Sequence, residues 1–349
     1  SDFSGESERD EGIYIYQFDQ TSGALTELDR VGGIVNPSYL AVDNDKRCLY
    51  AVSEVLEESA SVVTAYTIDP ETGALTHLNH KVALGKISAY VSLDQTSRMV
   101  LVSNYGGGDA VVAFPIGEDG ALMPASSTHK HTDAPSGVVA HRQEASHPHC
   151  IDTDPTNTFA LACDLGLDQV IVYRLDAENH TLSNQSPAYK TAPGAGPRHL
   201  KFHPTLNRVY VLNELNSTVS VLLLDRETGT LTEQQTLSTL PDDFTEHNQC
   251  SGLHITPDGR YLYGANRGHD SLAIYAVDET TGALTIVGHQ TTKGDTPRGF
   301  AIDPSGKFVI VANQESDTIV VFRIDQNTGL LEDTGVMVTC PKPACVKVL

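Results

Sequence analysis

The sequence predicts an all-β protein, a β-propeller whose seven blades each have four antiparallel strands, in one domain over residues 1–349. A strand rich in β-branched and aromatic residues, followed by a turn of D-x-x-T-G-x-L type, recurs seven times. A second pair of short strands lies between successive copies, so each repeat of about 50 residues makes one blade. No long segment shows the 3.6-residue apolar period of a helix.

The turn of each recurring hairpin is the most regular feature of the repeat. Its last position needs a positive φ, which glycine adopts without a steric penalty. Glycine occupies this position in six copies and histidine in one: Gly23, Gly73, Gly120, His180, Gly229, Gly282 and Gly329. The spacing of 47 to 60 residues between these positions is the period of the repeat.

The two ends of the chain each supply part of a blade. Strands are expected at residues 13–18 and 25–31, and a last strand at residues 344–349. We expect residues 344–349 to be the innermost strand of the blade whose outer strands are 13–18 and 25–31, which closes the ring and removes open sheet edges. Insertions at residues 123–146 and 236–250 lengthen two repeats and are candidate lids over a pocket.

Composition narrows the class of protein. The net charge of −22, from 23 basic and 45 acidic residues, argues against binding to nucleic acid or to an anionic membrane. The six scattered cysteines are typical of reduced thiols in a cytosolic protein, and the polar residues 1–12 predict no signal peptide. We expect a cytoplasmic monomer or weak homodimer, in which an anionic ligand must meet a local basic pocket.

Positions that align between repeats lie in rings around the axis of a propeller. Because neighbouring strands are antiparallel, the start of the innermost strand and the end of the next strand share one mouth of the channel. The first ring, at the start of the innermost strand, reads Ser38, Ala89, His149, Arg198, Ser251, Arg298 and Ala344. The second ring, at the end of the next strand, reads Glu54, Tyr105, Leu165, Glu214, Arg267 and Gln314.

The charged members of these rings predict an anion-binding catalytic site. Three arginines, Arg198, Arg267 and Arg298, suit a negatively charged ligand. His149 and Glu214 are a histidine and a carboxylate that suit proton transfer. A structural alternative remains, in which the arginines bond loop carbonyls between blades and His149 is a buried histidine with a packing role.

A neighbouring ring of oxygen-bearing side chains has two interpretations. Its members could bind a divalent cation, or they could form a repeated turn in which each side chain bonds its own backbone. We favour the turn, because nearly every copy carries such a residue, and we expect no metal or cofactor. His147 and His149 match no zinc spacing. The ring reads Ser53, Asn104, Asp164, Asn213, Asn266 and Asn313.

The motifs SHPHC, DLGLDQVIVYRLD, GAGPRHLKFHP, YVLNEL, TPDGRYLYGANRGHDS and TPRGFAIDPSGKF resemble those of the bacterial 6-phosphogluconolactonase family of propeller type over nearly the whole chain. That family is similar in fold to the fungal carboxy-cis,cis-muconate lactonizing enzyme, where a His, an Arg and a Glu are implicated in catalysis with a further Arg nearby. By motif, the resemblance implies these roles for His149, Arg198, Glu214 and Arg267. The opening SDFSGES departs from the G-T-Y-T strand usual in the family.

The resemblance implies a hydrolase that converts the small anionic 6-phospho-D-glucono-1,5-lactone to 6-phosphogluconate in the pentose phosphate pathway. The candidate residues permit this chemistry without a metal, so we expect a metal-independent enzyme. Alternatives are a lactonizing or lactonase activity on a polycarboxylate such as a carboxymuconate, and a non-catalytic ligand-binding propeller. The expected catalytic residues are His149 as general base, Arg198 at the carbonyl oxygen and Glu214 to orient them. The expected substrate-binding residues are Arg267, Arg298, His147 and Tyr105.

Overall fold

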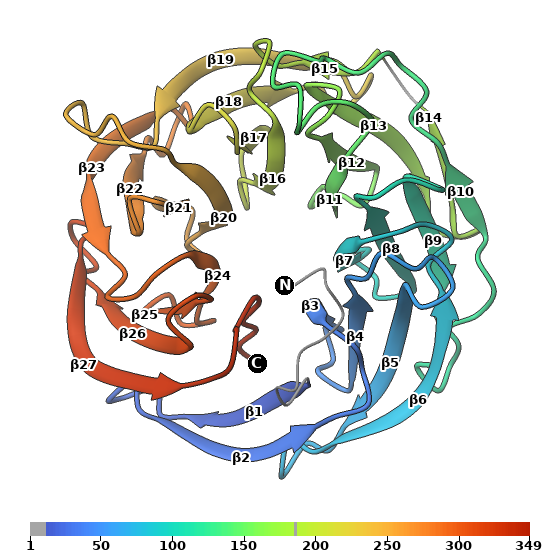
Figure 1. Cartoon of the computed structure of the whole chain (residues 1–349), viewed down its shortest axis with the longest axis horizontal. Coiled ribbons are helices and arrows are strands. Elements are labelled where there is room, and N and C mark those ends of the chain that lie inside the picture. Colours follow the sequence, from blue (N-terminus) through green and yellow to red (C-terminus); the bar gives the residue numbers. More distant parts are fainter. Residues whose placement is uncertain (1–11, 185–186) are drawn as a thin grey trace. The chain divides into compact units, whose positions relative to one another are not determined.

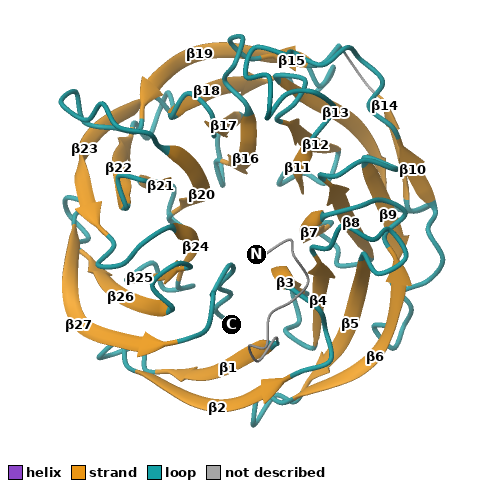
Figure 2. Ribbon diagram, viewed as in Figure 1, coloured by secondary structure: helices purple, strands orange, loops and turns teal. Residues whose placement is uncertain are grey.

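The computed structural model describes residues 12–184 and 187–349, and strand is the only regular secondary structure in them (Figure 2). The 27 strands of this part form seven sheets, five with four strands, one with five and one with two. The all-β, four-stranded repeat is therefore confirmed. No helix in the described residues is long and apolar enough to cross a lipid bilayer. The expectations about residues 1–11 lie outside this part.

The first compact unit, built mainly from residues 28–197, holds three sheets that lie side by side (Figure 1). The first comprises β3 (Pro37–Val42), β4 (Cys48–Ser53), β5 (Val62–Ile68) and β6 (Leu75–Val82). The second comprises β7 (Ser88–Leu93), β8 (Met99–Asn104), β9 (Val111–Pro115) and β10 (Ser127–His129). The third comprises β11 (Pro148–Thr153), β12 (Phe159–Asp164) and β13 (Gln169–Asp176), with β14 (Thr181–Asn184) and β15 (Tyr189–Lys190) both paired to β13.

The second compact unit, built mainly from residues 198–225 and 231–349, also holds three sheets. The first comprises β16 (Pro197–Phe202), β17 (Arg208–Asn213), β18 (Thr218–Leu224) and β19 (Leu231–Ser238). The second comprises β20 (Gln249–Ile255), β21 (Tyr261–Arg267), β22 (Ser271–Val277) and β23 (Leu284–Thr291). The third comprises β24 (Pro297–Ile302), β25 (Phe308–Asn313), β26 (Thr318–Ile324) and β27 (Leu331–Thr339). A single domain over the whole chain stays a prediction.

The remaining sheet has two strands, β1 (Ile13–Phe18) and β2 (Leu25–Val31), with the expected bounds. The expected closing strand at residues 344–349 is wrong as a strand, because residues 340–349 contain none. They pass beside β24 instead, where the carbonyl of Ala344 lies against Gly299. A four-stranded blade would need another strand between residues 344–349 and β1. No described strand is available for this place, because all strands other than β1 and β2 belong to the six other sheets. Ring closure stays a prediction.

The seven expected turns are confirmed by their backbone conformation. The φ angles of all seven turn positions are positive, from 55° at His180 to 85° at Gly120. In five of these turns an aspartate side chain accepts the backbone N–H groups two and three residues later. These bonds lower the pKa of the carboxyl group in four of the turns, and in the fifth the side-chain amide of Asn179 lowers the pKa of Asp176 most, followed by the backbone bonds. These turn aspartates account for part of the acidity of the chain, and they are Asp19, Asp69, Asp176, Asp278 and Asp325.

Neighbouring sheets within each unit are joined by buried tyrosines. The hydroxyl group on the second strand of one sheet donates to the carbonyl of the turn glycine in the next sheet. The pairs are Tyr50 with Gly120 (2.9 Å), Tyr210 with Gly282 (3.0 Å) and Tyr263 with Gly329 (2.7 Å). Burial raises the pKa of all three phenols, which therefore keep the hydrogen that they donate. These bonds fix the distance between sheets and so the position of the strand ends that carry the site.

Candidate active site

Four residues of the first ring lie at β-bulges in the first strands of their sheets. In β11, Pro148 and Cys150 are paired to consecutive residues of β12, so His149 is an extra residue. The same register shift leaves Arg298 as an extra residue in β24. Ser38 in β3 and Ala89 in β7 occupy equivalent bulges. A bulge bends its strand and re-aims the side chain of the extra residue, so this strand end can present a side chain for chemistry.

In four sheets a backbone hydrogen bond joins the second ring to the residue just before the strand that carries the first ring. A backbone N–H of the second ring donates to the carbonyl two residues before the bulge. The bonds are Glu54 N to Asn36 O (3.1 Å), Tyr105 N to Ile87 O (2.9 Å), Leu165 N to His147 O (3.0 Å) and Gln314 N to Thr296 O (2.9 Å). The prediction that both rings lie at the same end of the sheet is confirmed in these four sheets.

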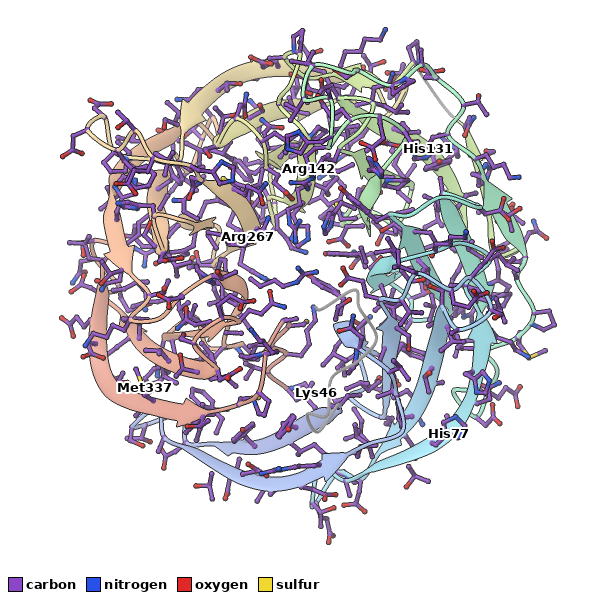
Figure 3. All side chains as sticks on the ribbon, in the orientation of Figure 1. Lys46, His77, His131, Arg142, Arg267 and Met337 are labelled. Carbon is purple, nitrogen blue, oxygen red and sulfur yellow. The ribbon has the colours of Figure 1, made fainter. Side chains whose placement is uncertain are left out.

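Arg198, Glu214 and Arg267 form a buried ion cluster in the second unit; Figure 3 labels Arg267, which ends β21. Arg198 Nη1 donates to Glu214 Oε2, and Arg267 Nη2 lies 3.2 Å from Glu214 Oε1. The Glu214 side chain is only 1% exposed, so each carboxylate oxygen is bound by a guanidinium away from water. The cluster carries one more positive charge than negative, as an anion-binding site requires.

Backbone carbonyls of β20 complete the cluster. Arg198 Nε donates to Ser251 O at 3.1 Å, and Arg267 Nη2 donates to Cys250 O at 3.0 Å. The structural alternative is met in part by Arg198, which bonds the backbone of a neighbouring sheet, although the acceptor lies in a strand. Arg267 bonds a strand of its own sheet. Ser251 Oγ in turn donates to Pro297 O at 2.6 Å, beside the half-buried Arg298. Guanidinium groups that are held in place in this way can stabilise a developing oxyanion without reorganising.

Tyr105, His147 and His149 form an aromatic group in the first unit. The Tyr105 ring stacks on His147 with 4.4 Å between centroids and an interplanar angle of 18°. It meets the ring of His149 edge to face at 5.5 Å and 72°. Both histidines are buried, with 8% of His147 and 5% of His149 exposed. Tyr105 therefore restricts the rotation of the histidine that the ring alignment assigns as a base.

Both ring nitrogens of His147 face hydrogen-bond acceptors. Nδ1 lies 2.9 Å from Tyr105 O, and Nε2 lies 3.1 Å from Glu144 Oε1. Glu144's own backbone N–H and the neighbouring His147 hold the pKa of the Glu144 carboxyl group below its usual value, so it accepts as a carboxylate. Both ring nitrogens of His147 are therefore occupied by contacts within the protein. His149 is the histidine of this group to which the ring alignment assigns proton transfer.

The seven predicted site residues fall into these two groups. Tyr105, His147 and His149 come together in the first unit, and Arg198, Glu214 and Arg267 in the second, where Arg298 follows Pro297. The convergence of the two groups on one substrate stays a prediction. Sequence reasoning missed Arg142 and Glu144, both in the insertion 123–146, and the carbonyl acceptors of β20. The insertion itself was the available signal, because it breaks the repeat.

The ring of oxygen-bearing side chains joins neighbouring sheets. Nδ2 of Asn104 donates to Ala83 O (2.8 Å), Nδ2 of Asn266 to Thr239 O (2.8 Å) and Nδ2 of Asn313 to Thr292 O (3.1 Å). Each acceptor directly follows the outer strand of the preceding sheet. The expected bonds to a residue's own turn are recorded for Asp164, which accepts the N–H groups of Gly166 and Leu167, and for Asn104, which donates to Asp109 O. The bonds to the preceding sheet were not expected. In the described part, no group of three or more His, Cys, Asp or Glu residues is placed to hold a metal ion.

Comparisons with known proteins agree with this architecture. The family model "Lactonase, 7-bladed beta-propeller" matches residues 4–348, so the chain belongs to this family. The 6-phosphogluconolactonase of Bacillus subtilis is 38% identical over 291 residues, which are 83% of this chain and 80% of that protein. The periplasmic gluconolactonase of Pseudomonas aeruginosa superimposes with a TM-score of 0.90 at 34% identity, over 98% of this chain and 95% of that one. A Lactobacillus plantarum protein superimposes with a TM-score of 0.88 at 34% identity, over 98% of this chain and 97% of that one.

Proposed function

We propose that this lactonase hydrolyses 6-phospho-D-glucono-1,5-lactone to 6-phosphogluconate. The observation that carries the proposal is the buried cluster of Arg198, Glu214 and Arg267, whose net positive charge suits an anionic lactone in a chain of net charge −22. The Bacillus subtilis relative that bears this activity in its name supports the choice of substrate. Hydrolysis of a lactone needs a general base and donors for the oxyanion, roles that a histidine and fixed guanidinium groups can fill.

In the proposed reaction His149 removes a proton from water, whose oxygen attacks carbon 1 of the lactone. The carbonyl oxygen becomes an oxyanion, which the guanidinium of Arg198 stabilises. The bond between carbon 1 and the ring oxygen then breaks, and the ring oxygen takes the proton from His149 and becomes a hydroxyl group. Glu214 binds Arg198 and Arg267 and positions both without touching the substrate. No metal takes part in these steps.

Two arginines are the proposed ligands of the phosphate group. Arg298 is its proposed ligand, together with Arg267, although Arg267 Nη2 already bonds Glu214 and Cys250. His147 and Tyr105 line the lactone ring. The same proposal holds that the protein works in the cytoplasm as a monomer or weak homodimer, and that it binds neither nucleic acid nor membrane.

The unphosphorylated glucono-1,5-lactone is a second candidate substrate, because the similar Pseudomonas aeruginosa protein is named a gluconolactonase. Initial rates on both lactones and on a carboxymuconate lactone, corrected for spontaneous hydrolysis, separate these functions. We expect kcat/KM for the phosphorylated lactone to exceed the other values by about tenfold or more, since one charge-assisted contact contributes at least that factor. A rate on the phosphorylated lactone equal to spontaneous hydrolysis would overturn the proposal.

A further inference from the structure

The loop of residues 131–147 connects β10 to β11 and contains polar groups that the proposed chemistry does not use. Both ends of this loop meet at one carboxylate, that of Asp164, which is fully buried. Asp164 Oδ2 accepts from His131 Nδ1 at 2.6 Å and from Ser146 Oγ at 2.5 Å. Asp164 Oδ1 accepts from the backbone N–H of His147 at 2.8 Å. The loop is therefore closed at its base beside the two histidines of the site.

The neighbours of Asp164 are hydrogen-bond donors. Its Oδ1 also accepts the N–H groups of Gly166 and Leu167, both at 3.1 Å. Burial raises the pKa of Tyr173, so this phenol keeps its hydrogen and donates it to His131 Nε2 at 2.6 Å. His131 then donates from Nδ1 to Asp164. Every neighbour is a donor, which explains why this copy has Asp where four others have Asn, whose amide group would also donate.

The middle of the loop is fixed as well. Gln143 is fully buried, and its Nε2 donates to Leu165 O at 2.9 Å and to Asp168 Oδ1 at 2.8 Å. Its Oε1 accepts the N–H of Val139 at 3.1 Å. The position of the adjacent Arg142 is thus set before any ligand arrives, which lowers the entropic cost of binding through its side chain.

Arg142 is brought against the aromatic group of the site. Its Nη2 donates to the hydroxyl oxygen of Tyr105 at 3.3 Å, and Figure 3 labels both Arg142 and His131. A guanidinium is a planar cation whose N–H groups all donate, and a phenol hydroxyl both donates and accepts. The pair of Arg142 and Tyr105 combines a positive charge with several donors. This combination matches an oxyanion better than a neutral hydroxyl group, which brings a hydrogen of its own.

We propose that Arg142 is a substrate-binding residue that recognises, with Tyr105, an anionic oxygen group of the lactone. In the substrate proposed above this group is the phosphate, so the inference rests on the proposed function. Asp164 is a positioning residue, which acts through the loop and through the backbone of His147.

The first test compares Arg142→Gln with Lys130→Gln, which removes a positive charge from an exposed position of the same insertion. Arg142→Gln raises KM for the phosphorylated lactone about tenfold, and changes KM for the unphosphorylated lactone and both kcat values less than about twofold. Lys130→Gln leaves all of these constants unchanged. Equal KM values for Arg142→Gln and the unaltered protein on the phosphorylated lactone would overturn the inference.

The second test concerns positioning. Asp164→Asn raises the same KM and also lowers kcat, because the loop and the backbone of His147 both shift. Asn313→Ser is the matched variant, since Ser53 holds this position in another sheet, and it alters thermal stability with unchanged KM. If Asp164→Asn lost stability while both kinetic constants kept their original values, Asp164 would have only a structural role.

Competition by inorganic phosphate separates this inference from the proposed function. If the unphosphorylated lactone proves to be the substrate, phosphate should still inhibit its hydrolysis competitively, and Arg142→Gln should weaken that inhibition about tenfold. The proposed function would then be wrong while the anion site at Arg142 stands. Inhibition constants that are equal in Arg142→Gln and the unaltered protein, or no inhibition by phosphate at all, would overturn the anion site itself.

Discussion

Replacing Glu214 by glutamine tests the ion cluster on which the proposed function depends. Glu214→Gln keeps the shape of the side chain but offers one acceptor oxygen and an NH₂ group. Glu214 now accepts from Arg198 on one oxygen and faces Arg267 Nη2 at 3.2 Å on the other. In the variant one of the two guanidinium groups faces the NH₂ group of glutamine instead of a carboxylate oxygen. This happens at a buried position, because the Glu214 side chain is only 1% exposed.

The contacts of Glu214 determine how much Glu214→Gln should change the free energy of unfolding and kcat. A hydrogen bond to a charged group contributes about 1.5 to 3 kcal/mol, and removing one partner of a buried pair costs about 3 to 5 kcal/mol. Because glutamine keeps one of the two contacts, we expect the free energy of unfolding to fall by about 2 to 4 kcal/mol. We also expect kcat to fall about 10- to 100-fold, since Arg198 loses its fixed position at the reacting carbonyl.

Urea unfolding and initial rates on the phosphorylated lactone measure the two effects on one preparation. Glu279→Gln is the matched control, because it removes the same charge from an exposed turn of the same unit, and it should change the free energy of unfolding by less than about 0.5 kcal/mol. A Glu214→Gln protein with unchanged stability and unchanged kcat would refute the reasoning. Lower stability at full kcat would keep the ion cluster but remove it from the catalytic site.

Three further predictions concern the base, the metal and the response to pH. His149→Ala should lower kcat about 100-fold with KM within about twofold, because a general base acts in the transition state, and full kcat would contradict its role. Exhaustive dialysis against EDTA should leave kcat intact, whereas activity lost and then restored by Ca²⁺ or Mg²⁺ would reassign the Asn104 ring as a metal site. Burial lowers the pKa of His203, whose Nδ1 accepts the N–H groups of Thr205 and Leu206. The unfolded chain therefore binds a proton that the folded chain does not, so stability should fall as the pH drops below about 6.5, by at most about 1.4 kcal/mol per pH unit. His203→Asn, which keeps the acceptor without titrating, should show a flatter urea-unfolding profile between about pH 7 and 5, and equal slopes would exclude the effect.

The repeat could be derived from the sequence because its information is local. Alternating apolar residues and turn residues specify each hairpin within about a dozen positions, so β1 and β2 have the expected bounds and the turn at His180 has the expected positive φ. The ring alignment follows from the same period, and it predicts that Arg198, Glu214 and Arg267 belong to one site, in agreement with their ion pairs. Residues 344–349 were predicted less well, because a strand forms only where a neighbouring strand exists to share its hydrogen bonds.

What the sequence by itself determined is therefore the all-β repeat and the strand ends that carry the chemistry. Only the tertiary structure decided which polar atoms pair there: both oxygens of Glu214 with two arginines, and Arg142 with a phenol 37 residues away. These pairings depend on the paths of the loops, above all of residues 131–147, and a loop has no period to read. Its path is set by buried hydrogen bonds between residues distant in the chain, such as those of Asp164, which form only once the sheets have packed.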